Sequence, residues 1–116
     1  MISNAELLKK TSRHTETALT EAQIDECLAA VPDWALADGK LTKTFSFKNY
    51  YETLAFVNAL AYMVHAEDHH PELVVTYNRC QVRFDTHSVN RGSGGLSEND
   101  FICAAKADAI ARRSFA

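Results

Sequence analysis

Pro71 is the residue that most restricts how this chain can fold, because it interrupts a long stretch with helical spacing. Apolar residues at positions 54, 57, 61 and 64 fall on one face of an α-helix. Proline has no backbone N–H to donate, and its ring disfavours the α conformation in the residue before it. We therefore predict an amphipathic helix over residues 50–66 that ends near the adjacent pair His69 and His70.

Capping signals predict one helix before this one and another after it. Thr20 and Gln23 have the spacing of a capping box, and Pro32 ends the apolar pattern that follows them. Ser97 is a favourable N-cap residue, and Asp100 falls in the first turn behind it, where a negative charge is stabilised by the helix dipole. We expect helices to begin at both positions.

Between the helices, two pairs of short alternating segments are typical of β-hairpins. They are residues 34–36 and 41–47 around the turn Asp38-Gly39, and residues 73–77 and 80–86 around the turn Asn78-Arg79. The order α-β-β-α-β-β-α indicates an α+β fold in a single domain: a four-stranded antiparallel sheet with the helices packed on one face.

The polar residues 1–18 are predicted to form a loose N-terminal arm, and residues 19–116 the folded domain. Four strands in one sheet leave open edges, which favour pairing with a second copy of the chain.

Composition excludes several classes of protein. The net charge of -3 argues against a protein that binds nucleic acid through phosphate contacts. No apolar run reaches the ~20 residues that span a bilayer, and the N-terminus lacks the pattern of a signal peptide. Three widely spaced cysteines fit reduced thiols better than a disulfide framework. We therefore expect a cytoplasmic protein without membrane or nucleic-acid partners.

Histidines are the candidate catalytic residues. Four of the five lie in residues 65–87: His65, His69, His70 and His87. Imidazole has an unperturbed pKa near 6.5, so it can give or take a proton at neutral pH. Two imidazoles on opposite sides of a substrate can act as general acid and general base in one step.

A metal site is the alternative interpretation of the same residues. His65 and His69 have helical i, i+4 spacing, and His87 could supply a third ligand. Glu67, however, does not occupy the position that the glutamate has in the H-E-x-x-H motif of zinc peptidases. We therefore favour acid-base chemistry, with no metal and no cofactor.

Motifs in the order found here resemble those of the pterin-4a-carbinolamine dehydratases, over roughly residues 19–111. The matching segments are Leu19-Thr20, Pro32-Asp33-Trp34, residues 45–49, residues 68–72, Tyr77-Asn78, Thr86-His87 and residues 95–100. Each segment is weakly specific alone, but their order and spacing together are specific.

The resemblance implies dehydration of 4a-hydroxytetrahydropterin to quinonoid dihydropterin, which recycles the pterin cofactor of aromatic amino acid hydroxylases. It implies that His69, His70 and His87 form the catalytic set, and we expect His69 and His87 to perform the acid-base steps while His70 orients the substrate. The residues expected to bind the substrate are Asp68, Pro71, Thr86 and Asp100. Either aspartate could instead orient an imidazole by accepting a hydrogen bond from its other N–H. For Asp100, a first-turn position in a helix is an equally good explanation.

Two features depart from the family pattern. His65 stands where members often carry a glutamate, and the loop over residues 88–95 is longer than usual. Both bear on the preferred substrate more than on the class of reaction.

The resemblance also implies homodimers or homotetramers. In animals it further implies a second role as a dimerisation cofactor for a homeodomain transcription factor. Two alternatives to the dehydratase therefore stay open: a non-enzymatic interaction module, and a relative that acts on another pterin, including one in molybdopterin metabolism.

Overall fold

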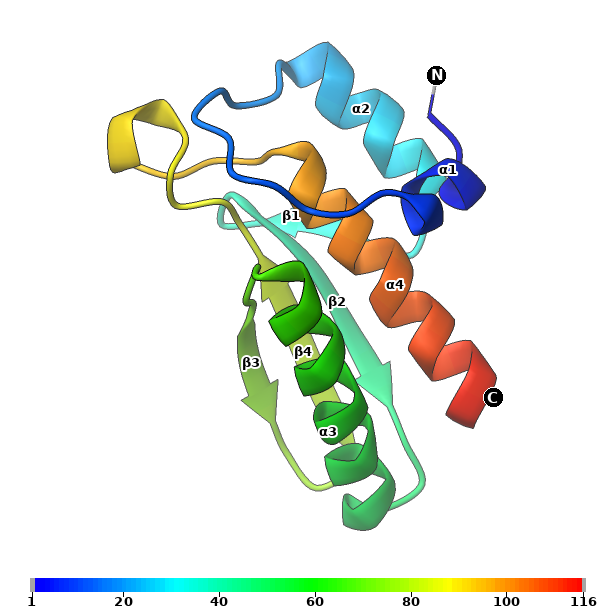
Figure 1. Ribbon diagram of the computed structural model, residues 1–116. Helices are drawn as coiled ribbons and strands as arrows, with labels where there is room; N and C mark the ends of the chain where they lie inside the picture. The colour runs from blue at the N-terminus through cyan, green and yellow to red at the C-terminus, as the bar shows by residue number, and fades with distance from the viewer. Residues whose placement is uncertain (1, 116) are drawn as a thin grey trace.

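The computed structural model describes residues 2–115, which form one sheet and one layer of helices (Figure 1). The elements are α1 (Asn4–Lys9), α2 (Glu21–Ala30), β1 (Ala35–Ala37), β2 (Lys40–Ser46), α3 (Tyr50–Glu67), β3 (Glu72–Val75), β4 (Arg79–Phe84), a 3-10 turn η1 (Asn90–Gly92) and α4 (Glu98–Phe115). No helix within residues 2–115 is long and apolar enough to cross a membrane.

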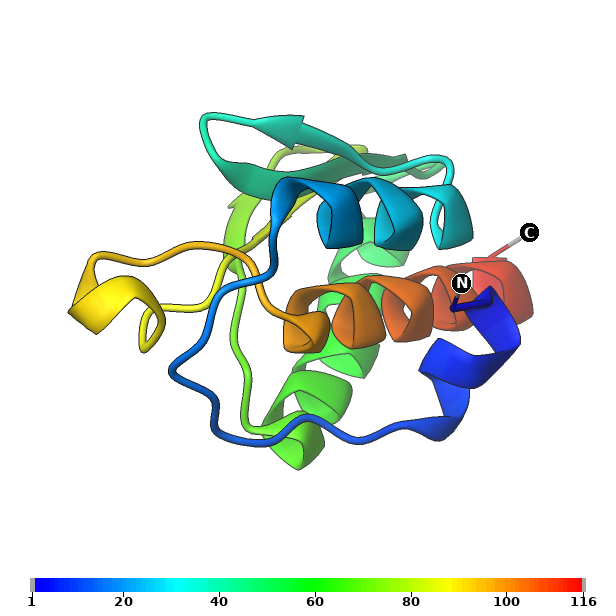
Figure 2. The same ribbon diagram turned by 90° about the horizontal axis from the view of Figure 1, so that it is seen from above.

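The four strands pair antiparallel in the order β1-β2-β4-β3. Helices α2, α3 and α4 all lie on the same face of the sheet, as the view from above shows (Figure 2). The predicted α+β fold with a four-stranded antiparallel sheet and helices on one face is therefore confirmed. Its edges are β1 and β3, and β3 leaves Val74 and Val75 exposed.

Every second side chain of β4 packs into the core between the sheet and the helices. Cys80, Val82 and Phe84 are buried, whereas Gln81 and Arg83 point away from the core. This is the period of two expected for a strand that is covered on one face. Phe56 of α3 is also fully buried, and the buried face of this helix is completed by Thr53, Leu60 and Met63.

The predicted helix ends are found close to the expected residues. The side chains of Thr20 and Gln23 form the predicted capping box at the start of α2. Helix α3 ends at Glu67, and Asp68 adopts a left-handed conformation with φ 52° while its N–H donates to the carbonyl groups of Val64 and His65. The backbone thus leaves the helix just before His69 and His70, as Pro71 requires.

The expectation of a loose N-terminal arm is wrong. Residues 4–9 form α1, which is closed by a capping box between Ser3 and Glu6. Leu7 of this helix is fully buried in the core, and the side chain of Asn4 donates to the carbonyl oxygen of Ala30. Ile2 and Leu8 are partly buried against the same core, and these contacts together hold the segment in place. The division into residues 1–18 and 19–116 remains a prediction.

The second hairpin turns slightly earlier than predicted. Strand β3 ends at Val75 and β4 already begins at Arg79, so the turn is made by residues 76–78 and closed by a hydrogen bond from the Thr76 N–H to the Arg79 carbonyl oxygen. Arg79 therefore belongs to the strand and not to the turn.

Candidate active site

A cavity of about 270 Å³ lies where the end of α3, the end of β4 and the N-terminal segment meet. This is slightly smaller than most ligand-binding cavities, which suits a compact substrate. Its walls are formed by Ser12, Arg13, His14, Thr15, Glu67, Asp68, His69, His70, Asp85, Thr86, His87, Ser88 and Asn99.

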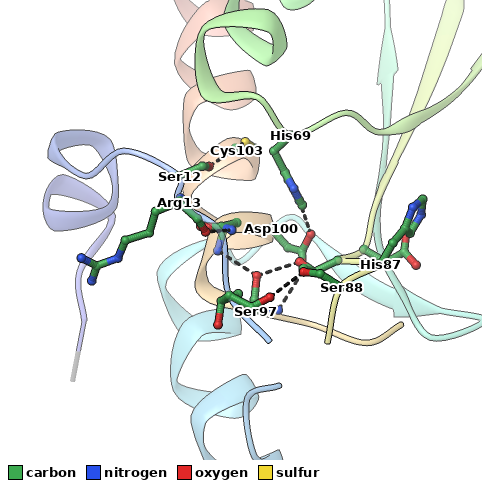
Figure 3. A network of polar contacts seen from close by, with 12 residues as sticks. Ser12, Arg13, His69, His87, Ser88, Ser97, Asp100 and Cys103 are labelled. Carbon is green, nitrogen blue, oxygen red and sulfur yellow. Dashed lines mark hydrogen bonds and ion pairs between the residues drawn. The ribbon is translucent and has the colours of Figure 1, made fainter. Parts of the chain in front are cut away.

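His69 is held by the carboxylate of Asp100, a residue of the first turn of α4 (Figure 3). Nε2 of His69 lies 2.6 Å from Oδ1 of Asp100, and the Asp100 side chain is completely buried. An ionised carboxylate only accepts hydrogen bonds, so Nε2 is the nitrogen that carries the proton. The imidazole also stacks on Phe84 with ring planes 9° apart. Ring position and tautomer are both fixed.

The second oxygen of Asp100 organises the start of α4. Oδ2 accepts hydrogen bonds of 2.9 Å from the hydroxyl of Thr86 and from the backbone N–H of Ser97. The Ser97 hydroxyl in turn accepts from the N–H of Asn99, as expected of an N-cap residue. Asp100 thus combines both interpretations of the sequence: it completes the helix start and it anchors a histidine.

His70 and His87 both line the cavity, and their rings contact each other edge to face. Their ring centroids are 5.6 Å apart with the planes nearly perpendicular. His87 is 68% exposed, and its Nε2 lies 3.3 Å from Oδ1 of Asp85. The site therefore contains one partly buried imidazole that is fixed in place, His69, and two exposed ones, His70 and His87.

The predicted site residues are distributed over three positions. His69, His70, His87, Asp68 and Thr86 line the cavity. Asp100 is not in the cavity wall but lies behind His69, in contact with its ring. Pro71 also lies outside the lining residues, and its clear effect is on the backbone, where it ends α3.

The structure does not assemble the alternative metal site. Within residues 2–115 no three histidine, cysteine, aspartate or glutamate side chains are grouped so that they could hold a metal ion. His65 is exposed and does not line the cavity, and Nε2 of His69 is engaged by Asp100. His65, where the resemblance led us to expect a glutamate, is thus separate from the cavity wall.

Glu67 is a site residue that the sequence did not reveal. Its buried carboxylate accepts hydrogen bonds of 2.7 Å from Nζ of Lys106 and from the backbone N–H of Ser12. Burial raises the pKa of this carboxyl, but the two hydrogen bonds and the positive charge of Lys106 outweigh it, so that the pKa of Glu67 lies below its ordinary value. Glu67 is thus held as a charged carboxylate two residues before His69.

Of the other residues missed from the sequence, Asn99 lies in the first turn of α4, whereas Ser88 and residues 12–15 lie in loops. Residues 12–15 belong to the segment that was expected to be loose. Asn99 belongs to the matching segment 95–100, in which only Asp100 was predicted as a site residue. The one usable signal was the proximity of Glu67, Ser88 and Asn99 in the sequence to predicted site residues.

Comparison with known proteins identifies similar chains over most of this length. The family model described as Pterin 4 alpha carbinolamine dehydratase matches residues 17–110. A protein of Bdellovibrio bacteriovorus, named "Putative pterin-4-alpha-carbinolamine dehydratase", is 58% identical over 116 residues, which cover 100% of this chain and 97% of that protein. A protein of the same name from Stenotrophomonas maltophilia is 60% identical over 94 residues, covering 79% and 78% of the two chains.

A solved structure shares the fold. It is the crystal structure of a transcriptional coactivator/pterin dehydratase from Brucella melitensis, with 36% sequence identity and a TM-score of 0.73. The match covers 82% of this chain and 99% of that one.

Proposed function

The chain belongs to the pterin 4 alpha carbinolamine dehydratase family, and on that premise we propose that it dehydrates 4a-hydroxytetrahydropterin to quinonoid dihydropterin. The observation that supports this reaction best is a cavity lined by His69, His70 and His87, in which the ring of His69 is anchored by Asp100. Imidazoles exchange protons readily near neutral pH. Three of them at one small cavity suit a reaction that moves two protons on a bicyclic ring.

The reaction itself is a balanced elimination of water. A general acid protonates the 4a-hydroxyl group, and the C4a–O bond breaks as water leaves. A general base takes the proton from N5, and the electron pair of the N5–H bond forms the N5=C4a double bond. One proton donor and one proton acceptor at the two positions complete the reaction.

We assign the proton transfers to His69 and His87, and the orientation of the substrate to His70. With Nε2 of His69 engaged by Asp100, its Nδ1 is the nitrogen left for proton transfer. Nε2 of each of these imidazoles lies beside a carboxylate oxygen, at 2.6 Å from Asp100 for His69 and at 3.3 Å from Asp85 for His87. Asp68 and Thr86 line the cavity, which supports substrate contacts there.

We further propose that the protein acts in the cytoplasm as a homodimer or homotetramer and recycles the pterin of aromatic amino acid hydroxylases. Three free and buried cysteines are compatible with a reducing compartment. Edge strand β3 exposes Val74 and Val75, and α3 exposes Tyr51 and Tyr62. Light scattering coupled to gel filtration tests the assembly, and a purely monomeric protein at micromolar concentration would contradict it.

A non-enzymatic interaction module is the second candidate, and the same exposed apolar residues favour it. The Brucella relative is described as both a coactivator and a dehydratase. Catalysis and interaction predict different outcomes for the histidines, because an interaction module does not depend on imidazoles around a cavity. A family member specific for another pterin would be recognised in a panel of pterin substrates, because it would convert that pterin faster than 4a-hydroxytetrahydropterin.

The decisive experiment is a direct dehydration assay on 4a-hydroxytetrahydropterin. We expect His69→Ala and His87→Ala each to lower kcat by roughly 100- to 10,000-fold, the usual contribution of a general acid or base. His65→Ala is the matched control, since His65 is exposed and outside the cavity, and it should retain activity. A wild-type protein no faster than the uncatalysed reaction would rule out the dehydratase.

A further inference from the structure

One wall of the cavity is built by a segment that the family model does not include. Residues 12–15, which we call the N-terminal strap, line the cavity opposite the predicted catalytic residues, whereas the family match begins at residue 17. The strap follows α1 and runs as an extended chain past the first turn of α4 (Figures 1 and 2).

Glu67 fixes the beginning of the strap. Its carboxylate accepts a 2.7 Å hydrogen bond from the backbone N–H of Ser12 and is itself paired with Lys106 of α4. Hydrogen bonds to a charged acceptor are stronger than neutral ones. Because Glu67 is the last residue of α3, the strap is tied to the helix end that positions His69.

Two further residues fix the middle and the end of the strap. The side-chain amide of Asn99 accepts from the N–H of Arg13 and donates to its carbonyl oxygen, at 3.2 and 2.7 Å. The hydroxyl of Ser88 donates to the carbonyl oxygen of Thr15. Ser88 opens the loop over residues 88–95, so this loop and the strap meet beside the cavity.

Between these fixed points, the peptide groups of His14 are available. Among residues 2–115, the structure records no hydrogen bond to the backbone N–H or carbonyl oxygen of His14, although this residue lines the cavity. The side chain of Arg13 points away from the histidines (Figure 3). The strap therefore offers one free backbone donor and one free acceptor, a combination that matches the amide-like edge of a pterin ring.

We propose that the N-terminal strap is part of the substrate site: it contacts the bound pterin through His14 and sets its affinity, and Glu67 and Asn99 are the residues that position it. This inference rests on the proposed function, because it takes the ligand to be a pterin. It adds a segment that determines specificity and lies outside residues 17–110, the part of the chain that the family model matches.

Trypsin tests the contact without requiring turnover. The bond after Arg13 lies within the strap, and exposed Arg112 near the end of α4 provides an internal reference site. If 6-methyl-7,8-dihydropterin, which lacks the 4a-hydroxyl group, binds only when the strap is closed, a concentration of ten times its Kd should slow cleavage after Arg13 about tenfold. Cleavage after Arg112 should be unchanged, and adenosine at equal concentration serves as the control ligand because its base lacks the amide-like N–H and C=O edge of a pterin.

Variants of the two positioning residues separate a substrate contact from a purely structural role. Glu67→Ala should accelerate cleavage after Arg13 and raise KM about tenfold with little change in kcat, whereas Glu67→Gln retains an acceptor for the Ser12 N–H and should stay nearer the wild type. Asn99→Ala should act like Glu67→Ala, and it provides an independent test if loss of the Glu67 charge prevents folding.

The outcomes distinguish this inference from the proposed reaction. Protection of Arg13 by the pterin in a protein without dehydratase activity would support the strap and refute the reaction. An active enzyme whose Arg13 is cleaved equally fast with and without the pterin would refute the strap. The strap would equally be refuted if Glu67→Ala and Asn99→Ala released it, seen as faster cleavage, and left KM unchanged.

Discussion

The buried carboxylate of Asp100 joins His69 to the start of α4, although the two residues are 31 positions apart in the sequence. Oδ1 accepts a hydrogen bond from the Nε2–H group of His69, with 2.6 Å between the nitrogen and the oxygen. Oδ2 accepts hydrogen bonds from the N–H of Ser97 and from the hydroxyl of Thr86. A residue that caps a helix therefore also determines the tautomer of a candidate catalytic histidine.

Asp100→Asn should separate these two tasks. The amide oxygen can still accept from Ser97, but an amide nitrogen facing His69 cannot accept the Nε2 proton, so the imidazole loses its fixed tautomer. We expect kcat to fall at least about tenfold and its pH profile to change. Ser97→Ala is the control: it removes a cap hydroxyl at about 1 kcal/mol of stability and should leave the pH profile unchanged. Unaltered kinetics in Asp100→Asn would contradict the role assigned to His69.

Glu67 should make stability depend on pH in the acid range. Its pKa in the folded protein lies below the ordinary value of 4.5, although burial acts in the opposite direction, because Lys106 and the Ser12 N–H stabilise the charged form. A carboxyl with a lowered folded pKa stabilises the protein above the ordinary pKa, and this contribution is lost as the pH falls through the folded pKa. Urea unfolding should therefore show a smaller loss of stability below about pH 4.5 in Glu67→Gln than in the wild type. If the free energy of unfolding fell equally with pH in both proteins, the ion pair between Glu67 and Lys106 would be contradicted.

The cysteine thiols should be unreactive in the native protein. Burial raises the pKa of Cys80 to about 11 and that of Cys103 to about 12, and burial likewise raises the pKa of Cys27. Thiolates are the reactive species, and hardly any form at pH 8 under these conditions. A thiol reagent such as Ellman's reagent should react slowly with the native protein and rapidly with all three cysteines in denaturant. Fast labelling of the native protein would indicate an opening near one of them.

Asp108 should be important for stability, whereas Asp33, the second carboxylate near Lys43, should not. The buried Asp108 carboxylate accepts hydrogen bonds from Nε1 of Trp34 at 3.0 Å and from Nζ of Lys43 at 2.6 Å. Asp108→Ala leaves both donors without this acceptor, and removing one partner of a buried ion pair typically costs about 3 to 5 kcal/mol. Asp33 is 77% exposed and 3.8 Å from Lys43, so Asp33→Ala should change stability by less than about 1 kcal/mol. Equal midpoints of thermal unfolding for the two variants would show that the Asp108 contacts contribute little.

The sequence by itself determined the parts of this protein that depend on neighbouring residues. The capping box of Thr20 and Gln23, the stop imposed by Pro71 and the alternation of Val82 and Phe84 are local patterns, and each predicted its element correctly. The concentration of histidines after α3 also pointed to the cavity, because Pro71 places His69 and His70 just beyond the helix end.

Only the tertiary structure decided what surrounds those histidines. Helix α1 gave no periodic signal, since Leu7 is its one fully buried residue and its neighbours come from distant elements. His69 is 31 residues from Asp100, Ser12 is 55 residues from Glu67, and Arg13 is 86 residues from Asn99. Hydrogen bonds between such residues form only after the sheet and helices have packed, so no local pattern encodes the N-terminal strap or the anchored tautomer of His69.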